Sequence, residues 1–266
     1  MVAEGARARG GGPALVYPRA MPTPIDHVLF VTLAVLFPLR ASTFGFRRLV
    51  LASAEQRPRV RLSVYRQAMF IQWGLALAAL ALWAARRREW EALGLVPRFG
   101  WGLAGVLMGL LVAGIAVARQ RRQVLEDEEA LSRLRARMSR LEVMLPHSRP
   151  ELSQFFKLSI TAGICEELLY RGYLIWYLSH WFTFYVAAAI AALVFGIGHV
   201  YQGWRGMITT GLVGAFLSAV YLVTGSLYAG MVIHALMDAH SGSLMQVAYD
   251  RETTLPLAPE EGEAHA

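Results

Sequence analysis

The segment ICEELLYR (residues 164–171) places the adjacent carboxylates of Glu166 and Glu167 inside an apolar, helix-length part of the chain. Ionisable side chains at membrane depth are expensive and, where they occur, usually serve a function. The segment therefore predicts a membrane-embedded fold with a functional site inside it. Two further apolar stretches carry ionisable groups of the same kind: His199 in one, and His234 and Asp238 in the other.

The composition supports a membrane protein. Hydrophobic residues make up 56% of the 266 residues, and the mean hydropathy is +0.41, which is too apolar for an ordinary soluble domain. Apolar runs of about 20 residues can cross a ~30 Å hydrocarbon layer as helices. The predicted fold is therefore all-α, a polytopic transmembrane helical bundle with about seven spans. These runs lie at residues 25–39, 68–85, 101–118, 155–178, 182–200, 207–223 and 227–249.

The chain between residues 119 and 145 has a different pattern, in which leucine and methionine recur at helical spacing among arginine and glutamate. This pattern predicts one amphipathic helix on the membrane surface, ended by Pro146 and Pro150. We therefore divide the chain into four parts: a disordered leader (1–24), N-terminal transmembrane helices with the amphipathic helix (25–148), a catalytic-type core with the buried ionisable groups (149–249) and an acidic tail (250–266).

The distribution of basic residues predicts the orientation in the membrane. Seven arginines lie between Arg40 and Arg66 and nine basic residues between Arg119 and Lys157, against four between Arg86 and Arg98. Cytoplasmic loops carry the excess of Lys and Arg, so we expect both rich segments, and hence the C-terminus, in the cytoplasm. Basic loops beside apolar spans indicate orientation and lipid contact, not nucleic-acid binding. The arginine-rich composition suggests a high-GC bacterium, and so a multi-pass protein of the bacterial inner (plasma) membrane.

Helix geometry brings the buried ionisable groups to similar depths. At 1.5 Å of rise per residue, Glu166, His199 and His234 all fall in the cytoplasmic half of the predicted bundle. Each group alone has a structural explanation: an intramembrane histidine is often a packing hydrogen-bond donor, and Glu167 with Arg171 forms an (i, i+4) ion pair. Several ionisable groups on three spans at one depth favour a shared site instead.

Three motifs around these residues resemble those of a known family. The likeness covers residues 152–238, about a third of the chain, and the motifs follow one another in the family's order. The chain resembles the CPBP family, the type II CAAX prenyl endopeptidases and their bacterial immunity-protein relatives, in these motifs: Glu166-Glu167-x-x-x-Arg171, Phe195-x-x-x-His199 and His234-x-x-x-Asp238.

The resemblance implies an intramembrane endopeptidase that cuts near the C-terminus or juxtamembrane region of a membrane-anchored polypeptide. It implies that Glu166 is the general base that activates water, that His199 assists it, and that His234 with Asp238 stabilises the oxyanion. The prenyl endopeptidases usually have Asn at the last position. An ionised Asp238 would repel an oxyanion, so it must be protonated, orient His234 or bind a metal. The supporting residues are Glu167, Arg171 and Phe195.

The sequence leaves four questions open: the cofactor, the substrate, the oligomeric state and a second function. A glutamate mechanism needs no cofactor, whereas His199 and His234 with Glu166 or Asp238 also form a plausible three-ligand zinc site with an open position for water. The substrate is a CAAX-like tail, a bacteriocin-type peptide or a C-terminal sorting signal, and the oligomeric state is open. The alternative function is a non-catalytic binding or immunity scaffold that uses the same cavity. A proton-coupled transporter is disfavoured because the chain shows no inverted repeat.

Overall fold

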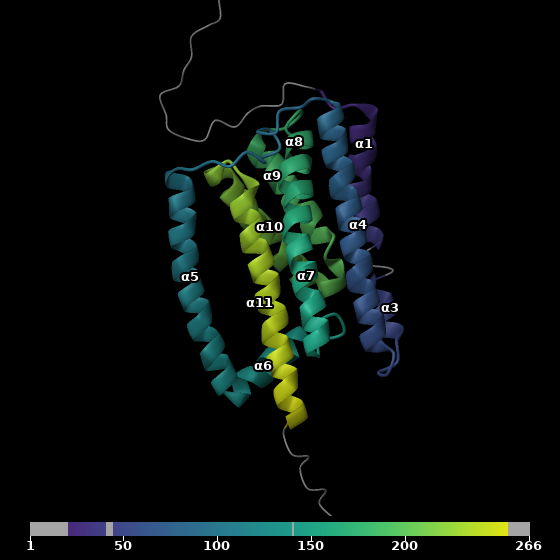
Figure 1. Ribbon diagram of the computed structural model, residues 1–266, viewed down its shortest axis with the longest axis vertical. Helices are drawn as coiled ribbons and strands as arrows, with labels where there is room; N and C mark the ends of the chain where they lie inside the picture. Colours follow the sequence, from purple (N-terminus) through teal and green to yellow (C-terminus); the bar gives the residue numbers. More distant parts are fainter. Residues whose placement is uncertain (1–20, 41–44, 140, 255–266) are drawn as a thin grey trace, which may run out of the picture.

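The structure, a computed structural model, describes residues 21–40, 45–139 and 141–254. Within these ranges every regular element is helical, which confirms the all-α prediction. The long helices lie side by side along the long axis of the molecule (Figure 1). Most of the predicted leader (1–24) and of the predicted acidic tail (250–266) lies outside these ranges.

The helical elements are named here in chain order, with η for segments of π- or 3₁₀-helix. α7, η3 and α8 follow one another without a break, so they form a single helical run. η1 and η3 are π-helical and η4 is 3₁₀-helical. The elements are α1 (Pro24–Val31), η1 (Thr32–Leu36), α2 (Phe37–Arg40), α3 (Phe46–Leu51), α4 (Arg57–Ala85), α5 (Trp101–Glu126), α6 (Glu128–Met138), α7 (Arg149–Glu166), η3 (Glu167–Leu174), α8 (Ile175–Leu178), α9 (Phe184–Ile197), η4 (Val200–Gln202), α10 (Gly203–Thr224) and α11 (Leu227–Thr254).

Three stretches of helix in the described part of the chain are long and apolar enough to cross a membrane: α4, α5 and the run from Val200 to Thr224. The helical stretches Pro24–Leu36 and Phe184–Ile197 are apolar but shorter. The predicted count of seven spans is therefore not confirmed. The predicted spans at 155–178, which lies in the run from α7 to α8, and at 227–249 in α11 are not among these three stretches. The polar and charged side chains that they carry lower their hydropathy.

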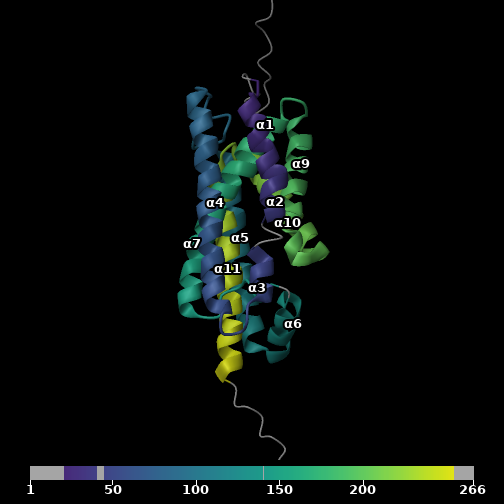
Figure 2. The same cartoon turned by 90° about the vertical axis from the view of Figure 1, so that its right-hand side faces the viewer.

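The predicted amphipathic surface helix at residues 119–145 is divided in the structure. α5 continues to Glu126, and α6 begins after Asp127, whose side chain accepts hydrogen bonds from the first turn of α6. Leu131 is fully buried, and Arg135 on the same helix donates a hydrogen bond to the carbonyl oxygen of Ala248 in α11. α6 thus lies beside the C-terminal part of α11 at one end of the bundle (Figure 2), and its Leu131 is buried in the protein, where the predicted surface helix would face lipid.

Glycines let the central helices approach closely. A Cβ atom added at Gly163 in α7 would lie 2.6 Å from the carbonyl oxygen of Met231 in α11. A Cβ atom added at Gly196 in α9 would lie 2.8 Å from the carbonyl oxygen of Met207 in α10. Small residues at such positions are what allows membrane helices to pack backbone against backbone. The close contact of α7 with α11 brings the Glu pair beside His234.

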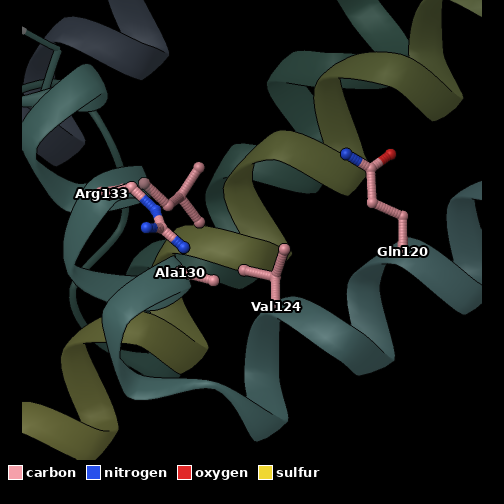
Figure 3. A pocket seen from close by; sticks show the side chains of 5 residues that line it. Gln120, Val124, Ala130 and Arg133 are labelled. Atoms are coloured by element: carbon pink, nitrogen blue, oxygen red, sulfur yellow. The ribbon is translucent and has the colours of Figure 1, made fainter.

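α5 lies at the edge of the bundle (Figure 1), and none of its side chains is buried in the protein. Its C-terminal end meets α6 around a pocket of about 190 Å³ (Figure 3). This pocket lies away from the motif residues, and its lining mixes polar and apolar side chains: Gln120, Val124, Ala130, Arg133 and Leu134.

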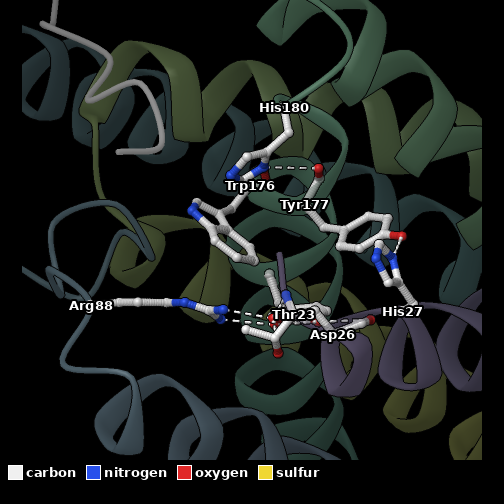
Figure 4. A network of polar contacts seen from close by, with 8 residues as sticks. Thr23, Asp26, His27, Arg88, Trp176, Tyr177 and His180 are labelled. Carbon is white, nitrogen blue, oxygen red and sulfur yellow. Dashed lines mark hydrogen bonds and ion pairs between the residues drawn. The ribbon is translucent and has the colours of Figure 1, made fainter. Parts of the chain in front are cut away.

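A buried ion pair between Asp26 and Arg88 connects α1 to the rest of the bundle (Figure 4). The fully buried carboxylate of Asp26 accepts two hydrogen bonds from the Arg88 guanidinium, at 2.8 and 2.6 Å. The Tyr173 hydroxyl donates to the same carboxylate at 3.0 Å, and Arg88 lies 4.3 Å over the ring of Trp176. These contacts join α1, the turn after α4, η3 and α8.

A second buried ion pair holds the segment between α6 and α7 at the other end. Arg61 Nη1 in α4 lies 2.7 Å from Glu151 Oε1 in α7, and Arg61 Nε donates to the carbonyl oxygen of Val143 at 2.9 Å. The backbone N–H of His147 donates to Glu151 Oε2 at 2.8 Å. The His147 ring stacks on Tyr249 of α11, with 3.8 Å between centroids.

Candidate active site

The two carboxylates of the first motif lie where α7 becomes the π-helical segment η3. Glu166 is the last residue of α7 and Glu167 the first of η3, and both are buried. π-helical turns inside α-helices are frequent at functional sites, and the wider turn changes which side chains point to a neighbouring helix. Here the neighbouring helix is α11, which carries the third motif.

Glu167 joins Arg171 and His234 into one buried chain of contacts. Glu167 Oε1 lies 3.0 Å from Arg171 Nη1 and 2.9 Å from His234 Nδ1. Both Glu167 and Arg171 are 1% exposed, so neither charge is screened by solvent. The guanidinium also lies 4.4 Å over the Phe195 ring. Because a carboxylate accepts, His234 Nδ1 carries a hydrogen, and the other ring nitrogen faces away from Glu167.

Glu166 lies on the opposite side of the same imidazole. Its Oε2 is 3.7 Å from His234 Nε2, and its Oε1 accepts a hydrogen bond of 2.9 Å from Gln72 Nε2 in α4. Asp238 Oδ2 is also 3.8 Å from His234 Nε2. Three carboxylates thus surround one ring. Its Nε2 lies between Glu166 and Asp238, so a hydrogen on this nitrogen would face both carboxylates.

His199 lies beside this group but is not bonded to Glu166. Its Nδ1 donates to the backbone carbonyl of Phe195 at 2.8 Å, so in the neutral ring Nε2 keeps its lone pair. The Phe195 ring separates the two histidines, at 4.8 Å from His199 and 5.9 Å from His234 between centroids. The expected pairing of His199 with Glu166 is therefore not a direct hydrogen bond in the described structure.

The described residues do not fit the zinc alternative. No group of three or more His, Cys, Asp and Glu side chains within residues 21–40, 45–139 and 141–254 is arranged to hold a metal ion.

Comparison with known proteins bears on the same part of the chain. Residues 148–240 match the family model described as type II CAAX prenyl endopeptidase Rce1-like. This segment is an Rce1-like domain. No curated protein and no solved structure compared with the chain matches it.

The Rce1-like match extends from the residue before α7 into α11, and it includes all three motifs. The family is one of membrane proteases, so the match supports a hydrolase. Taken with the apolar helices, it indicates an integral membrane protein.

The motif residues are recognisable from the sequence, whereas the contact of Gln72 with Glu166 was not expected. A signal was available, since this amide is a polar side chain within the apolar stretch 68–85. Polar groups at membrane depth need a partner, and the partner of Gln72 is Glu166.

Proposed function

We propose that the protein is an intramembrane endopeptidase that hydrolyses a peptide bond near the C-terminus or juxtamembrane region of a membrane-anchored polypeptide. The observation that carries the proposal is the position of the Glu166 carboxylate, buried and held between the amide of Gln72 and the imidazole of His234. A buried carboxylate opposite a hydrogen-bond donor can supply the general base and the oxyanion stabilisation that peptide hydrolysis uses.

In the proposed reaction Glu166 is the general base. Its Oε2 takes a proton from water while the water oxygen forms a bond to the carbonyl carbon of the substrate. The C=O π electrons move to the carbonyl oxygen, and the Nε2–H of His234 stabilises that oxyanion. When the intermediate collapses the C–N bond breaks, and Glu166 returns the proton to the leaving nitrogen. The products are a carboxylic acid and an amine, and Glu166 is regenerated.

The other residues support these two. Glu167, ion-paired with Arg171, accepts the hydrogen at Nδ1 and so fixes the orientation of the His234 ring. Asp238, 3.8 Å from Nε2, helps to keep that nitrogen protonated until the oxyanion forms. The lone pair of His199 Nε2 is available to accept a hydrogen bond from water on the far side of Phe195.

The buried position of the Glu pair and the apolar outer surface of the bundle support a lipid-embedded substrate. Residues around the Glu pair are buried within the helical bundle, and large apolar side chains of α5 and α10 are exposed on its outside. A chain anchored in the bilayer reaches such a site without leaving lipid. We place the basic end of the bundle and the C-terminus in the cytoplasm of a bacterial cell, on the positive-inside argument.

The test is membrane proteomics in a strain that lacks the protein and is complemented with variants. Glu166→Gln should leave a membrane polypeptide uncleaved, and Glu128→Gln, an exposed carboxylate change on α6, should restore the wild-type pattern. If Glu166→Gln restores cleavage as well as wild type, the peptidase proposal is wrong. Retained biological activity without cleavage would favour the binding or immunity scaffold. The C-terminus of the accumulated polypeptide would distinguish a CAAX-like tail, a bacteriocin-type peptide and a sorting signal.

A further inference from the structure

Gln72 contacts the candidate base from outside the Rce1-like segment. Its side chain lies in α4, is 5% exposed, and donates from Nε2 to Glu166 Oε1 at 2.9 Å. An amide nitrogen donates and does not accept, so this contact stabilises the ionised carboxylate relative to the acid. The matched residues begin at 148, so the family resemblance gives no role to this contact.

The carbonyl half of the same amide is unsatisfied. Gln72 Oε1 is buried and accepts no hydrogen bond from any residue in the described ranges. Buried polar atoms are nearly always paired with protein, water or ligand, because leaving one unpaired is costly. Both atoms belong to one planar amide, so this open acceptor lies beside the Glu166 carboxylate. A water molecule bound there would be next to the base.

We infer that Gln72 is a positioning residue for Glu166, an inference that rests on the proposed peptidase function. By holding Oε1, the amide leaves Oε2 as the carboxylate oxygen that faces His234 and takes the proton from water. Without this donor the carboxylate would rotate freely about its last torsion and bind protons more readily. Gln72 acts through Glu166 and is not itself part of the bond-making chemistry.

The first test measures the protonation of Glu166 without needing the substrate. Dicyclohexylcarbodiimide is an apolar reagent that modifies protonated carboxyl groups, and mass spectrometry locates the adduct on Glu166. Full-length protein in lipid vesicles is labelled over a pH series as wild type, Gln72→Met and Gln67→Met. Gln67 lies on the same helix, is exposed and accepts a hydrogen bond from Arg48, so it is the matched control.

We expect Gln72→Met to label about tenfold faster than wild type at alkaline pH, because one hydrogen bond to the charged form has been removed. At acid pH, where the carboxyl is protonated in every variant, the labelling rates should coincide. Gln67→Met should follow wild type throughout. Identical wild-type and Gln72→Met rates at every pH would overturn the inference. So would an equal change at all pH values, since that indicates altered access of the reagent.

The second test separates this inference from the proposed function. The polypeptide that accumulates with Glu166→Gln is quantified in strains that carry Gln72→Met, Gln67→Met or both Glu166→Gln and Gln72→Met. We expect Gln72→Met to slow its cleavage by about 10- to 100-fold and to add nothing to Glu166→Gln. If Glu166→Gln has no effect, the peptidase function fails. If Glu166→Gln blocks cleavage but Gln72→Met cleaves normally, only the role of Gln72 fails.

Discussion

Glu166 and Glu167 are neighbours in the chain, yet they face opposite nitrogens of one imidazole. Glu167 Oε1 lies 2.9 Å from His234 Nδ1, whereas Glu166 Oε2 lies 3.7 Å from Nε2. Successive residues of a helix point about 100° apart, so two adjacent side chains can enclose a ring from a facing helix. The shorter contact fixes the ring, and the longer one leaves Glu166 free to exchange a proton.

The Glu167 and Arg171 pair gives the first prediction. Glu167→Gln should destabilise the protein by about 3 to 5 kcal/mol, because it leaves the buried Arg171 guanidinium without a counter-charge. The double replacement Glu167→Gln with Arg171→Met should recover much of the lost stability. It should not restore cleavage, since His234 then lacks its anionic acceptor. Denaturant unfolding in detergent measures the stability. A double variant that is no more stable than the single one would contradict this account.

Asp238 gives the second prediction, because the resembled prenyl endopeptidases usually have Asn at this position. Asp238→Asn should keep the cleavage rate within about tenfold of wild type, since an amide can also donate to an oxyanion. Asp238→Leu should lower the rate further, because it offers Nε2 of His234 neither a charge nor a hydrogen bond. Both expectations are tested by measuring the rate at which each variant cleaves the polypeptide that accumulates with Glu166→Gln. Equal rates for Asp238→Leu and wild type would exclude any role for the carboxylate.

The contact of α7 with α11 gives the third prediction. Gly163→Ala should cost roughly 1 to 3 kcal/mol, because the added carbon would meet the Met231 carbonyl at 2.6 Å and push the helices apart. Cleavage should fall as well, since the same contact brings Glu167 to His234. Gly109→Ala on α5 is the control, as an added Cβ there has nothing within 4 Å. Thermal unfolding of both variants measures the difference, and equal effects would contradict the role of Gly163.

The fourth prediction concerns pH. Burial lowers the pKa of His147 below its ordinary value of 6.5, and the charge of Arg61 lowers it further. The unfolded chain therefore binds this proton more readily than the folded one, so His147 destabilises the fold as pH falls below about 6.5. His147→Phe keeps the stacking on Tyr249 and cannot titrate. Its melting temperature should fall less than that of wild type between about pH 7 and pH 5. A parallel decrease in both proteins would show that His147 does not contribute.

The sequence was sufficient for the part of the site that depends on helix periodicity. The spacing of Glu167 and Arg171 predicts their ion pair, and the structure has it. The similar depths of Glu166 and His234 predict that their helices bring them together, and their side chains approach within 3.7 Å. Depth alone could not show that the ring of Phe195 would separate the two histidines.

Contacts between distant segments could not be predicted from the sequence. Asp26 and Arg88 are 62 residues apart, and nothing local indicates that one neutralises the other. Gln72 is 94 residues from Glu166, and although its polar amide in an apolar stretch indicates a need for a partner, nothing local indicates which residue that partner is. Pairings of this kind depend on how helices rotate in the packed bundle, which single-helix periodicity does not fix.

The π-helical segment η3 also limits how this chain can change in length. It carries Glu167 and Arg171 at its start and Tyr173, which reaches Asp26, near its end. Removing one residue would return this wider segment towards α-helical winding and change the direction in which the side chains around the deletion point. The contacts of Glu167, Arg171 and Tyr173 depend on those directions. Evolution can therefore exchange side chains in this segment far more readily than it can insert or delete residues.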